Sequence, residues 1–239
     1  MSTDKTLTDV ANVNVMQAWK QQLEIQKLVE LIADEFIRNI QPLVRARSAA
    51  LISEMCEEYD FDADFYASTP DKDAEFAAEL YPNLLYSSLF TASYFTFERS
   101  LHEICRSVQQ VQEHDIGPSD FAGSGIKRSQ LYLKKVAGFT FPEDPQRWQR
   151  MSDLHELRNV VAHNGGYLEP GRTSKHVFRI VEQDPHLTLG AAGDIRFSSQ
   201  FVSDACFLMQ DLLLELSSTI FESTDEHAEM LDREFGVQD

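Results

Sequence analysis

The sequence predicts an all-α protein, a helical bundle with one minor β-hairpin. Apolar residues recur at helical intervals over most of the 239 residues. Glycine and proline stand near the ends of these periodic segments. Because 43% of the residues are hydrophobic, the chain can bury a sizeable core. We expect a helical arm over residues 1–60, an acidic loop and short helix over 61–81, a bundle over 82–222 and an acidic tail over 223–239.

The arm consists of strong helix formers over residues 13–58, with apolar side chains at helical spacing. Pro42 interrupts this run. Since proline removes a backbone donor and crowds the preceding turn, we expect it to kink the helix or split it in two. Residues 60–73 contain five Asp and one Pro, which indicates an acidic loop. A short helix should follow over residues 74–80.

The bundle should contain three helices before the hairpin. Proline suits the first turn of a helix, so Pro82 is expected to begin a central helix that runs to about residue 113. The next helix covers residues 127–137 and stops at a glycine. A third helix begins at Pro145 and ends before Gly165 and Gly166, since glycine readily adopts the left-handed conformation that ends a helix.

The C-terminal third is predicted to hold the hairpin and one more helix. Residues 177–181 and 187–189 are short apolar runs separated by turn-forming residues, which favours two paired strands. The last helix should cover residues 199–221. The tail from Glu222 is acidic, and we expect it to fray.

The formal charge of −18 is distributed unevenly along the chain. Residues 127–179 carry a net charge of +5, and the remainder of the chain carries −23. A basic segment in an acidic protein indicates a focused anion site, because phosphate contacts need local positive charge. An uneven scatter of surface charge would give the same pattern.

The sequence shows no sign of a membrane segment, a disulfide framework or a metal site. The N-terminus lacks a basic region followed by an apolar run, and no window approaches about 20 apolar residues, so we expect a cytoplasmic protein that does not enter a membrane. Three distant cysteines indicate a reducing compartment and lack zinc-type spacing. We expect no cofactor.

One stretch, residues 158–163, brings together side chains suited to phosphodiester chemistry. Arg158 can donate a fork of hydrogen bonds to phosphate, and a histidine such as His163 can accept and return a proton. On a helix, Asn159 and His163 lie one above the other with Arg158 about 100° away, so the three can converge at one helix edge. RNA supplies its own nucleophile, the 2′-hydroxyl, and such a site needs no metal.

The arginine-to-histidine spacing carries little weight by itself. Arg150 and His155 repeat it in the same helix without special context. Of the two matches, only Arg158 is followed by asparagine, and only His163 is followed closely by a glycine pair. The alternative is a purely structural role, in which Arg158 pairs with Glu98 or Glu156 and His163 is a cationic helix end.

This stretch resembles the signature of HEPN domains, in which an arginine, then a polar residue, is followed by a histidine four to six residues later. The upstream segment Tyr94-Phe95-Thr96-Phe97-Glu98 is similar to the HEPN helix in which an aromatic pair precedes a glutamate directed at the active arginine. The helix over residues 127–137 also fits. The resemblance covers about residues 82–222.

The resemblance implies an up-and-down helical bundle that forms a homodimer and cleaves RNA without a metal, as a toxin or antiviral nuclease. Arg158, Asn159 and His163 would be catalytic, and Glu98 would orient Arg158. The RNA contacts are expected at three basic residues of the positive segment, Lys127, Arg128 and Arg172. An antitoxin or sensor protein is a possible partner. The alternative is a catalytically inactive HEPN-like module that acts through protein interactions, as a sensor or an inhibitory partner.

Overall fold

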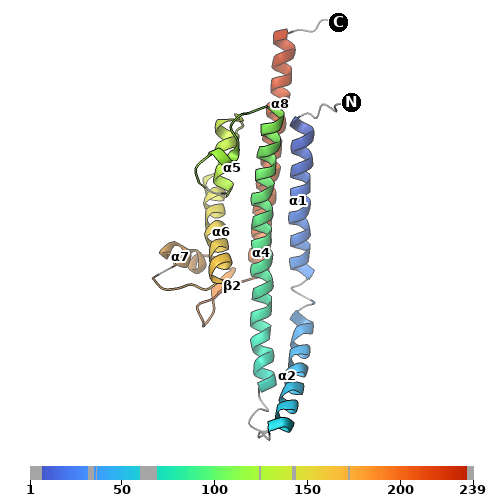
Figure 1. Cartoon of the computed structure of the whole chain (residues 1–239), viewed down its shortest axis with the longest axis vertical. Coiled ribbons are helices and arrows are strands. Elements are labelled where there is room, and N and C mark those ends of the chain that lie inside the picture. Colours follow the sequence, from blue (N-terminus) through green and yellow to red (C-terminus); the bar gives the residue numbers. More distant parts are fainter. Residues whose placement is uncertain are drawn as a thin grey trace. The chain divides into compact units, whose positions relative to one another are not determined.

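The structure is a computed structural model that describes residues 7–31, 35, 37–59, 69–123, 125–141, 144–171 and 173–235. It is mostly helical and contains one two-stranded antiparallel sheet (Figure 1), which confirms the all-α class with a minor hairpin. Among the described residues, no helix combines the length and apolarity that crossing a bilayer requires. The chain divides into two compact units, one of residues 1–24, 92–158 and 204–239, the other of 25–91 and 159–203.

The predicted arm contains two helices, α1 (Leu7–Leu31) and α2 (Ile37–Tyr59). Of the two outcomes predicted for Pro42, a split is wrong, because α2 continues through this residue and the division between the helices lies before it. As the sixth residue of α2, Pro42 removes one backbone hydrogen bond of the helix. Most of the predicted acidic loop, residues 60–68, lies outside the described residues.

Helix α4 (Thr69–Val111) replaces the predicted short helix and long helix with one element of 43 residues. Pro82 therefore lies inside a helix and does not begin one. Buried side chains occur on both sides of it, with Ala77 before and Tyr86 after the proline. Packing along the whole helix outweighs the local penalty of the proline, as tertiary contacts often outweigh propensity.

In the first unit, the second half of α4 packs with α1 and α8 (Ser199–Phe235) around a buried polar contact. Gln22 Nε2 of α1 donates to the Ser93 carbonyl oxygen at 2.8 Å, and the Ser93 hydroxyl donates to Gln22 Oε1. The Ser93 hydroxyl also lies 3.2 Å from Cys206 Sγ of α8. Both Gln22 and Ser93 have no exposed surface, so the pairing satisfies groups that would be costly to bury alone.

Helix α8 extends well past its predicted end at residue 221, and the tail that was expected to fray is helical as far as Phe235. The last residues, 236–239, lie outside the described part of the chain. Acidic residues do not prevent a helix from continuing, since glutamate is a good helix former.

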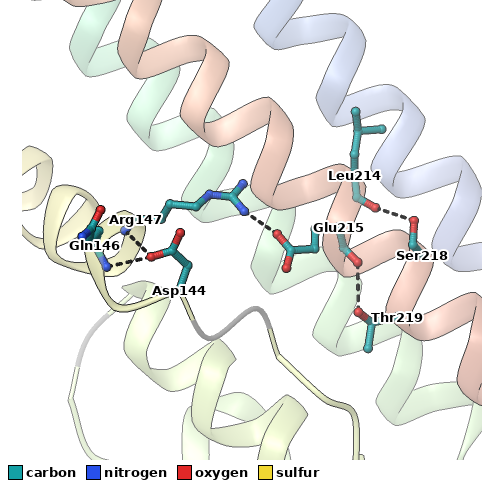
Figure 2. A network of polar contacts seen from close by, with 7 residues as sticks. All are labelled: Asp144, Gln146, Arg147, Leu214, Glu215, Ser218 and Thr219. Atoms are coloured by element: carbon teal, nitrogen blue, oxygen red, sulfur yellow. Dashed lines mark hydrogen bonds and ion pairs between the residues drawn. The ribbon is translucent and has the colours of Figure 1, made fainter.

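Helix α6 (Pro145–Asn164) begins where Pro145 predicted and is joined to α8 at this end (Figure 2). The Asp144 carboxylate accepts hydrogen bonds from the backbone amides of Gln146 and Arg147, at 2.9 and 3.4 Å, and so caps the first turn. The Arg147 guanidinium forms an ion pair with Glu215 of α8. These contacts set the position of the helix that carries the predicted site.

In the second unit, residues 177–181 form part of helix α7 (Lys175–Gln183), so the prediction of a strand here is wrong. The Ser174 side chain accepts a hydrogen bond from the Val177 amide and caps the helix. Val177, Ile180 and Val181 are all buried, which is the spacing of one helix face. The run was too short for its period to distinguish a strand from a helix.

The hairpin consists instead of β1 (Leu187–Leu189) and β2 (Ile195–Phe197), with Leu187 opposite Phe197. Asn83 of α4 binds β2 through both ends of its amide: Nδ2 donates to the Ile195 carbonyl at 3.0 Å, and Oδ1 accepts from the Phe197 amide at 2.9 Å. The Phe197 ring also stacks on Phe90 of α4, with ring centroids 5.6 Å apart. The hairpin is therefore fixed to the first half of α4.

Candidate functional site

The predicted site lies on the second half of α6, and the helix ends as its sequence indicates. Gly165 and Gly166 have φ values of +61° and +86°, in the left-handed region that favours glycine. Their amides donate to the carbonyl oxygens of Val161 and Val160, at 3.1 and 3.2 Å, which satisfies acceptors of the last turn. His163 lies in this last turn and is exposed.

Arg158 forms an ion pair with Glu98 of α4, the contact that the sequence predicted. Arg158 Nη2 donates to Glu98 Oε2 at 2.9 Å. Only 12% of the Arg158 side chain and 22% of the Glu98 side chain are exposed. A pair that is largely removed from water is screened less than a surface pair, and it becomes costly when one partner is removed.

Two aromatic rings of α4 lie against the Arg158 guanidinium. Its Cζ atom is 4.9 Å from the centroid of Tyr94 and 4.7 Å from that of Phe95. Both distances are within the range of cation–π attraction. With Glu98, these residues fix the guanidinium from three positions within one helical turn of α4.

Tyr94 also joins the cluster to a second α6 residue, His155. The Tyr94 hydroxyl and His155 Nδ1 share a hydrogen bond of 3.1 Å. Burial raises the pKa of Tyr94 well above its usual value and the Glu98 charge raises it further, while the Arg158 charge lowers it in part. The hydroxyl therefore stays protonated at any physiological pH.

Glu98 contacts the start of α5 (Gly125–Lys135) as well as Arg158. Gly125 has a φ of +49°, and a Cβ atom built on it would overlap Glu98 Oε1 and lie 2.8 Å from Glu98 Cδ. Only glycine allows the α5 backbone to come this close to the carboxylate. The helix N-terminus, which carries partial positive charge, thus lies beside Glu98 Oε1, while Arg158 Nη2 binds Oε2.

Two pockets adjoin this cluster in the first unit. One, of about 340 Å³, shares Tyr94 and His155 with the cluster and is also lined by Ile126, Lys127, Gln130, Trp148, Met151 and Ser152. The other, of about 450 Å³, shares Phe95 and Glu98 and is also lined by Arg99, His102, Pro118, Ser119, Gly125 and Arg128. Lys127 and Arg128, two of the predicted RNA contacts, thus line one pocket each. The third predicted contact, Arg172, lies outside the described residues.

The remaining predicted catalytic residues, Asn159 and His163, follow Arg158 on the same helix. Asn159 is half-buried. At 100° per residue, His163 is about 140° around the helix from Arg158, whereas His155 is about 60° away. Within the described part of the chain, the His163 side chain makes no hydrogen bond or ion pair.

His155 is the residue that sequence reasoning missed. Its spacing from Arg150 matched the motif by chance and gave no reason to select it. The useful signal was its position three residues before Arg158, because residues at i and i+3 share a helix face. Among the described residues, no group of three or more His, Cys, Asp or Glu side chains is arranged to hold a metal ion.

No protein-family model, curated protein or solved structure matches this chain. The fold and the site define an all-α protein with a largely buried arginine–glutamate pair, two flanking aromatic rings and two adjacent pockets.

Proposed function

We propose that this chain is a metal-independent endoribonuclease of the HEPN type, acting on RNA in the cytoplasm. The observation that carries the proposal is the ion pair between Glu98 of α4 and Arg158 of α6, whose guanidinium lies against the rings of Tyr94 and Phe95. A guanidinium fixed in this way can stabilise a phosphate without losing its charge or moving during the reaction.

The reaction is an internal transesterification. A histidine accepts the proton of the 2′-hydroxyl, the 2′-oxygen bonds to phosphorus, and the bond between phosphorus and the 5′-oxygen breaks. A proton donated by an acid neutralises the departing 5′-oxygen. The products are a 2′,3′-cyclic phosphate and a 5′-hydroxyl, and no outside reactant is consumed. In this scheme Arg158 stabilises the phosphorane, His163 moves the proton and Asn159 assists by hydrogen bonding.

The acid and the base have to be separate groups, and a single His163 supplies one of them. We propose that a homodimer supplies the second from the partner's equivalent helix end. His163 is exposed at the end of α6, where a second copy can reach it. Lys127 and Arg128 are exposed on α5 and would contact RNA phosphates. A nuclease of this kind fits a toxin or antiviral role with an antitoxin or sensor partner.

The second candidate is a catalytically inactive HEPN-like module that acts through protein contacts. The observation that favours it is the burial of Arg158, since a side chain with 12% exposure and a carboxylate partner can be wholly structural. Such a module would bind a basic partner through the acidic segments outside residues 127–179, which together carry a net charge of −23.

One experiment separates the two candidates. The purified protein is incubated with total RNA in EDTA, beside His163→Ala and a second histidine variant outside the proposed site, His176→Ala. His163 is exposed, so its substitution should leave the fold intact. We expect cleavage by the parent and by His176→Ala, a loss of about 100-fold or more in His163→Ala, and cyclic phosphate ends on the products.

Equal cleavage by the parent and His163→Ala would show that this histidine is not catalytic. No cleavage by the parent at any concentration, together with stable binding to a basic protein, would favour the inactive module. Arg158→Lys completes the series, because it keeps the charge and loses the fork, so a nuclease should lose most of its activity while an ion pair with Glu98 persists.

A further inference from the structure

The first half of α4 carries large apolar side chains on its solvent side and small ones on its buried side. Ala74 and Ala77 are buried, at 1% and 3% exposure. Phe76, Leu80 and Leu84 recur every four residues, so they follow one side of the helix, and they are 64%, 39% and 59% exposed. A single exposed leucine is ordinary, but a row of apolar side chains on one helix face indicates a surface that another molecule covers.

Helix α2 adds two leucines to the same side of the helix pair. The two helices lie antiparallel within the second unit, and Arg45 Nε of α2 is 2.8 Å from Asp71 Oδ1 of α4 (Figure 1). Leu43 lies about 160° around α2 from Arg45, on the side opposite this ion pair. Phe76 lies about 140° around α4 from Asp71, on that same side. Leu43 and Leu51, two turns apart, are 65% and 42% exposed. We call Leu43, Leu51, Phe76, Leu80 and Leu84 the apolar face.

The apolar face has the size of a contact with one helix. At about 200 Å² for a whole side chain of this size, its five residues expose roughly 500 Å². A stable interface between two folded proteins buries about 800 Å² on each partner. The rows on α2 and α4 each span about 12 Å and follow one another, which matches a partner helix of about 16 residues. Two packed helices with exposed apolar rows can receive a third, amphipathic helix.

The charge around the apolar face selects the kind of partner. Residues 43–84 contain ten acidic and three basic residues, a net charge of −7. Asp73 stands three residues before Phe76, and Glu54 stands three residues after Leu51, so each carboxylate lies beside the face. Both acids are exposed. Their charge repels a second copy of this chain, RNA and an anionic membrane, and it attracts a segment rich in lysine or arginine.

We propose that the apolar face docks a basic amphipathic helix of another protein. The partner's apolar row would cover the face, and its lysine or arginine side chains would lie toward Asp73 and Glu54. Most of the face precedes residue 82, outside the segment that resembles HEPN domains. The docking surface is therefore independent of the ribonuclease site, and it serves the chain whether or not the chain cleaves RNA.

The test titrates the full chain into three fluorescein-labelled peptides of about 18 residues and measures fluorescence anisotropy. The first peptide has leucines at i, i+3, i+4 and i+7 and lysines elsewhere. The second has the same composition in scrambled order, and the third has glutamate in place of every lysine. We expect saturable binding of the first peptide, with a Kd of about 1–100 μM at about 0.15 M salt. The scrambled peptide should bind at least tenfold more weakly, and the glutamate peptide should not bind.

Two double substitutions of exposed apolar residues supply the matched comparison. Phe76→Ser/Leu80→Ser alters the apolar face, and Phe207→Ser/Leu214→Ser alters two residues of α8 that are 48% and 42% exposed. Circular dichroism checks that both variants are folded. The first variant should bind the leucine–lysine peptide at least tenfold more weakly than the parent, and the second should bind it as the parent does. Asp73→Lys, at an exposed position, should weaken binding about threefold to tenfold, and less at high salt.

Three outcomes overturn the proposal. No saturable binding of the leucine–lysine peptide does so, as does equal binding of the scrambled peptide, which would show attraction by charge alone. An equal effect of the two double substitutions would place the binding elsewhere on the chain. If the peptide does not bind and sedimentation shows that Phe76→Ser/Leu80→Ser dissociates a dimer of the parent, a second copy covers the face instead. Loss of RNA cleavage in His163→Ala should leave peptide binding unchanged, so the two proposals fail separately.

Discussion

The substitution Gly125→Ala tests the structure at the point where α5 meets Glu98. The alanine Cβ would overlap Glu98 Oε1, so the carboxylate has to move or α5 has to shift. Either movement disturbs the ion pair between Glu98 and Arg158. The effect would be indirect, because none of the contacts described above joins Gly125 to Arg158 or to α6. The backbone also has a φ of +49°, which an alanine adopts only with strain.

The two costs can be estimated separately. A left-handed conformation costs a non-glycine residue about 1–2 kcal/mol. Loss of a fully buried ion-pair partner costs about 3–5 kcal/mol, and the partial exposure of both side chains reduces this to roughly 1–3 kcal/mol. We therefore expect Gly125→Ala to lower the free energy of unfolding by about 2–5 kcal/mol in total.

Gly138→Ala is the matched control. Gly138 also has a positive φ, +74°, but a Cβ atom there would meet nothing within 4 Å. Its substitution should cost about 1–2 kcal/mol, from the backbone strain alone. A second control removes the obstacle: in a Glu98→Ala background, Gly125→Ala should cost no more than Gly138→Ala does in the parent.

The assay is urea unfolding followed by circular dichroism, with the midpoint and slope compared across the four variants. We expect the double variant Gly125→Ala/Glu98→Ala to lose less stability than the sum of the two single losses. Equal losses for Gly125→Ala and Gly138→Ala in the parent, with no coupling to Glu98, would refute the reasoning. The Glu98 carboxylate would then not lie against the start of α5.

Two further predictions concern the hairpin and the buried thiols. Asn83→Ala removes both hydrogen bonds to β2 and should lower the free energy of unfolding in urea by about 1–3 kcal/mol. The control Asn39→Ala, at an exposed position, should change it very little, and equal losses for the two variants would contradict this role of Asn83. Burial raises the pKa of Cys206 to about 11 from an ordinary value of 9.0. The thiol therefore ionises at lower pH in the unfolded chain than in the folded one. Its contribution to the free energy of unfolding is fully present below pH 9 and falls by about 3 kcal/mol as the pH rises to 11. Cys206→Ala should flatten this part of the curve of stability against pH. An unchanged curve would show that the thiol is not protected.

The helix ends of α6 were predictable because their signals are local. Pro145 follows a capping aspartate, and the glycine pair at residues 165–166 supplies the φ values that ended the helix. Such signals act within one turn and need no knowledge of the rest of the fold. The contact between Glu98 and Arg158 was expected from the resemblance of residues 94–98 to a HEPN helix whose glutamate is directed at the arginine.

The errors occurred where distant packing decides the outcome. Pro82 lies inside α4, since it removes one hydrogen bond while buried side chains occur on both sides of it. Pro42 also lies inside a helix, α2. Residues 177–181 carry β-branched side chains, yet a serine cap and three buried positions on one face make them helical. No local signal states which neighbouring element will cover a short apolar run.

The choice of histidine shows the same limit at the site. Sequence reasoning selected His163 for its glycine pair and discarded His155 as a chance match. The structure places His155 on the Arg158 side of α6, through Tyr94, and leaves His163 exposed at the helix end. If a single chain supplied both the arginine and the histidine, His155 would have to transfer the proton. Its Nδ1, however, is hydrogen-bonded to the Tyr94 hydroxyl, which stays protonated. If two chains cooperate, exposure is what a shared cleft requires, and His163 meets that requirement. Under the proposed ribonuclease function, the number of copies in the active form therefore determines which histidine transfers the proton. RNA cleavage by His163→Ala and His155→Ala, assayed over a range of protein concentrations, would distinguish the two.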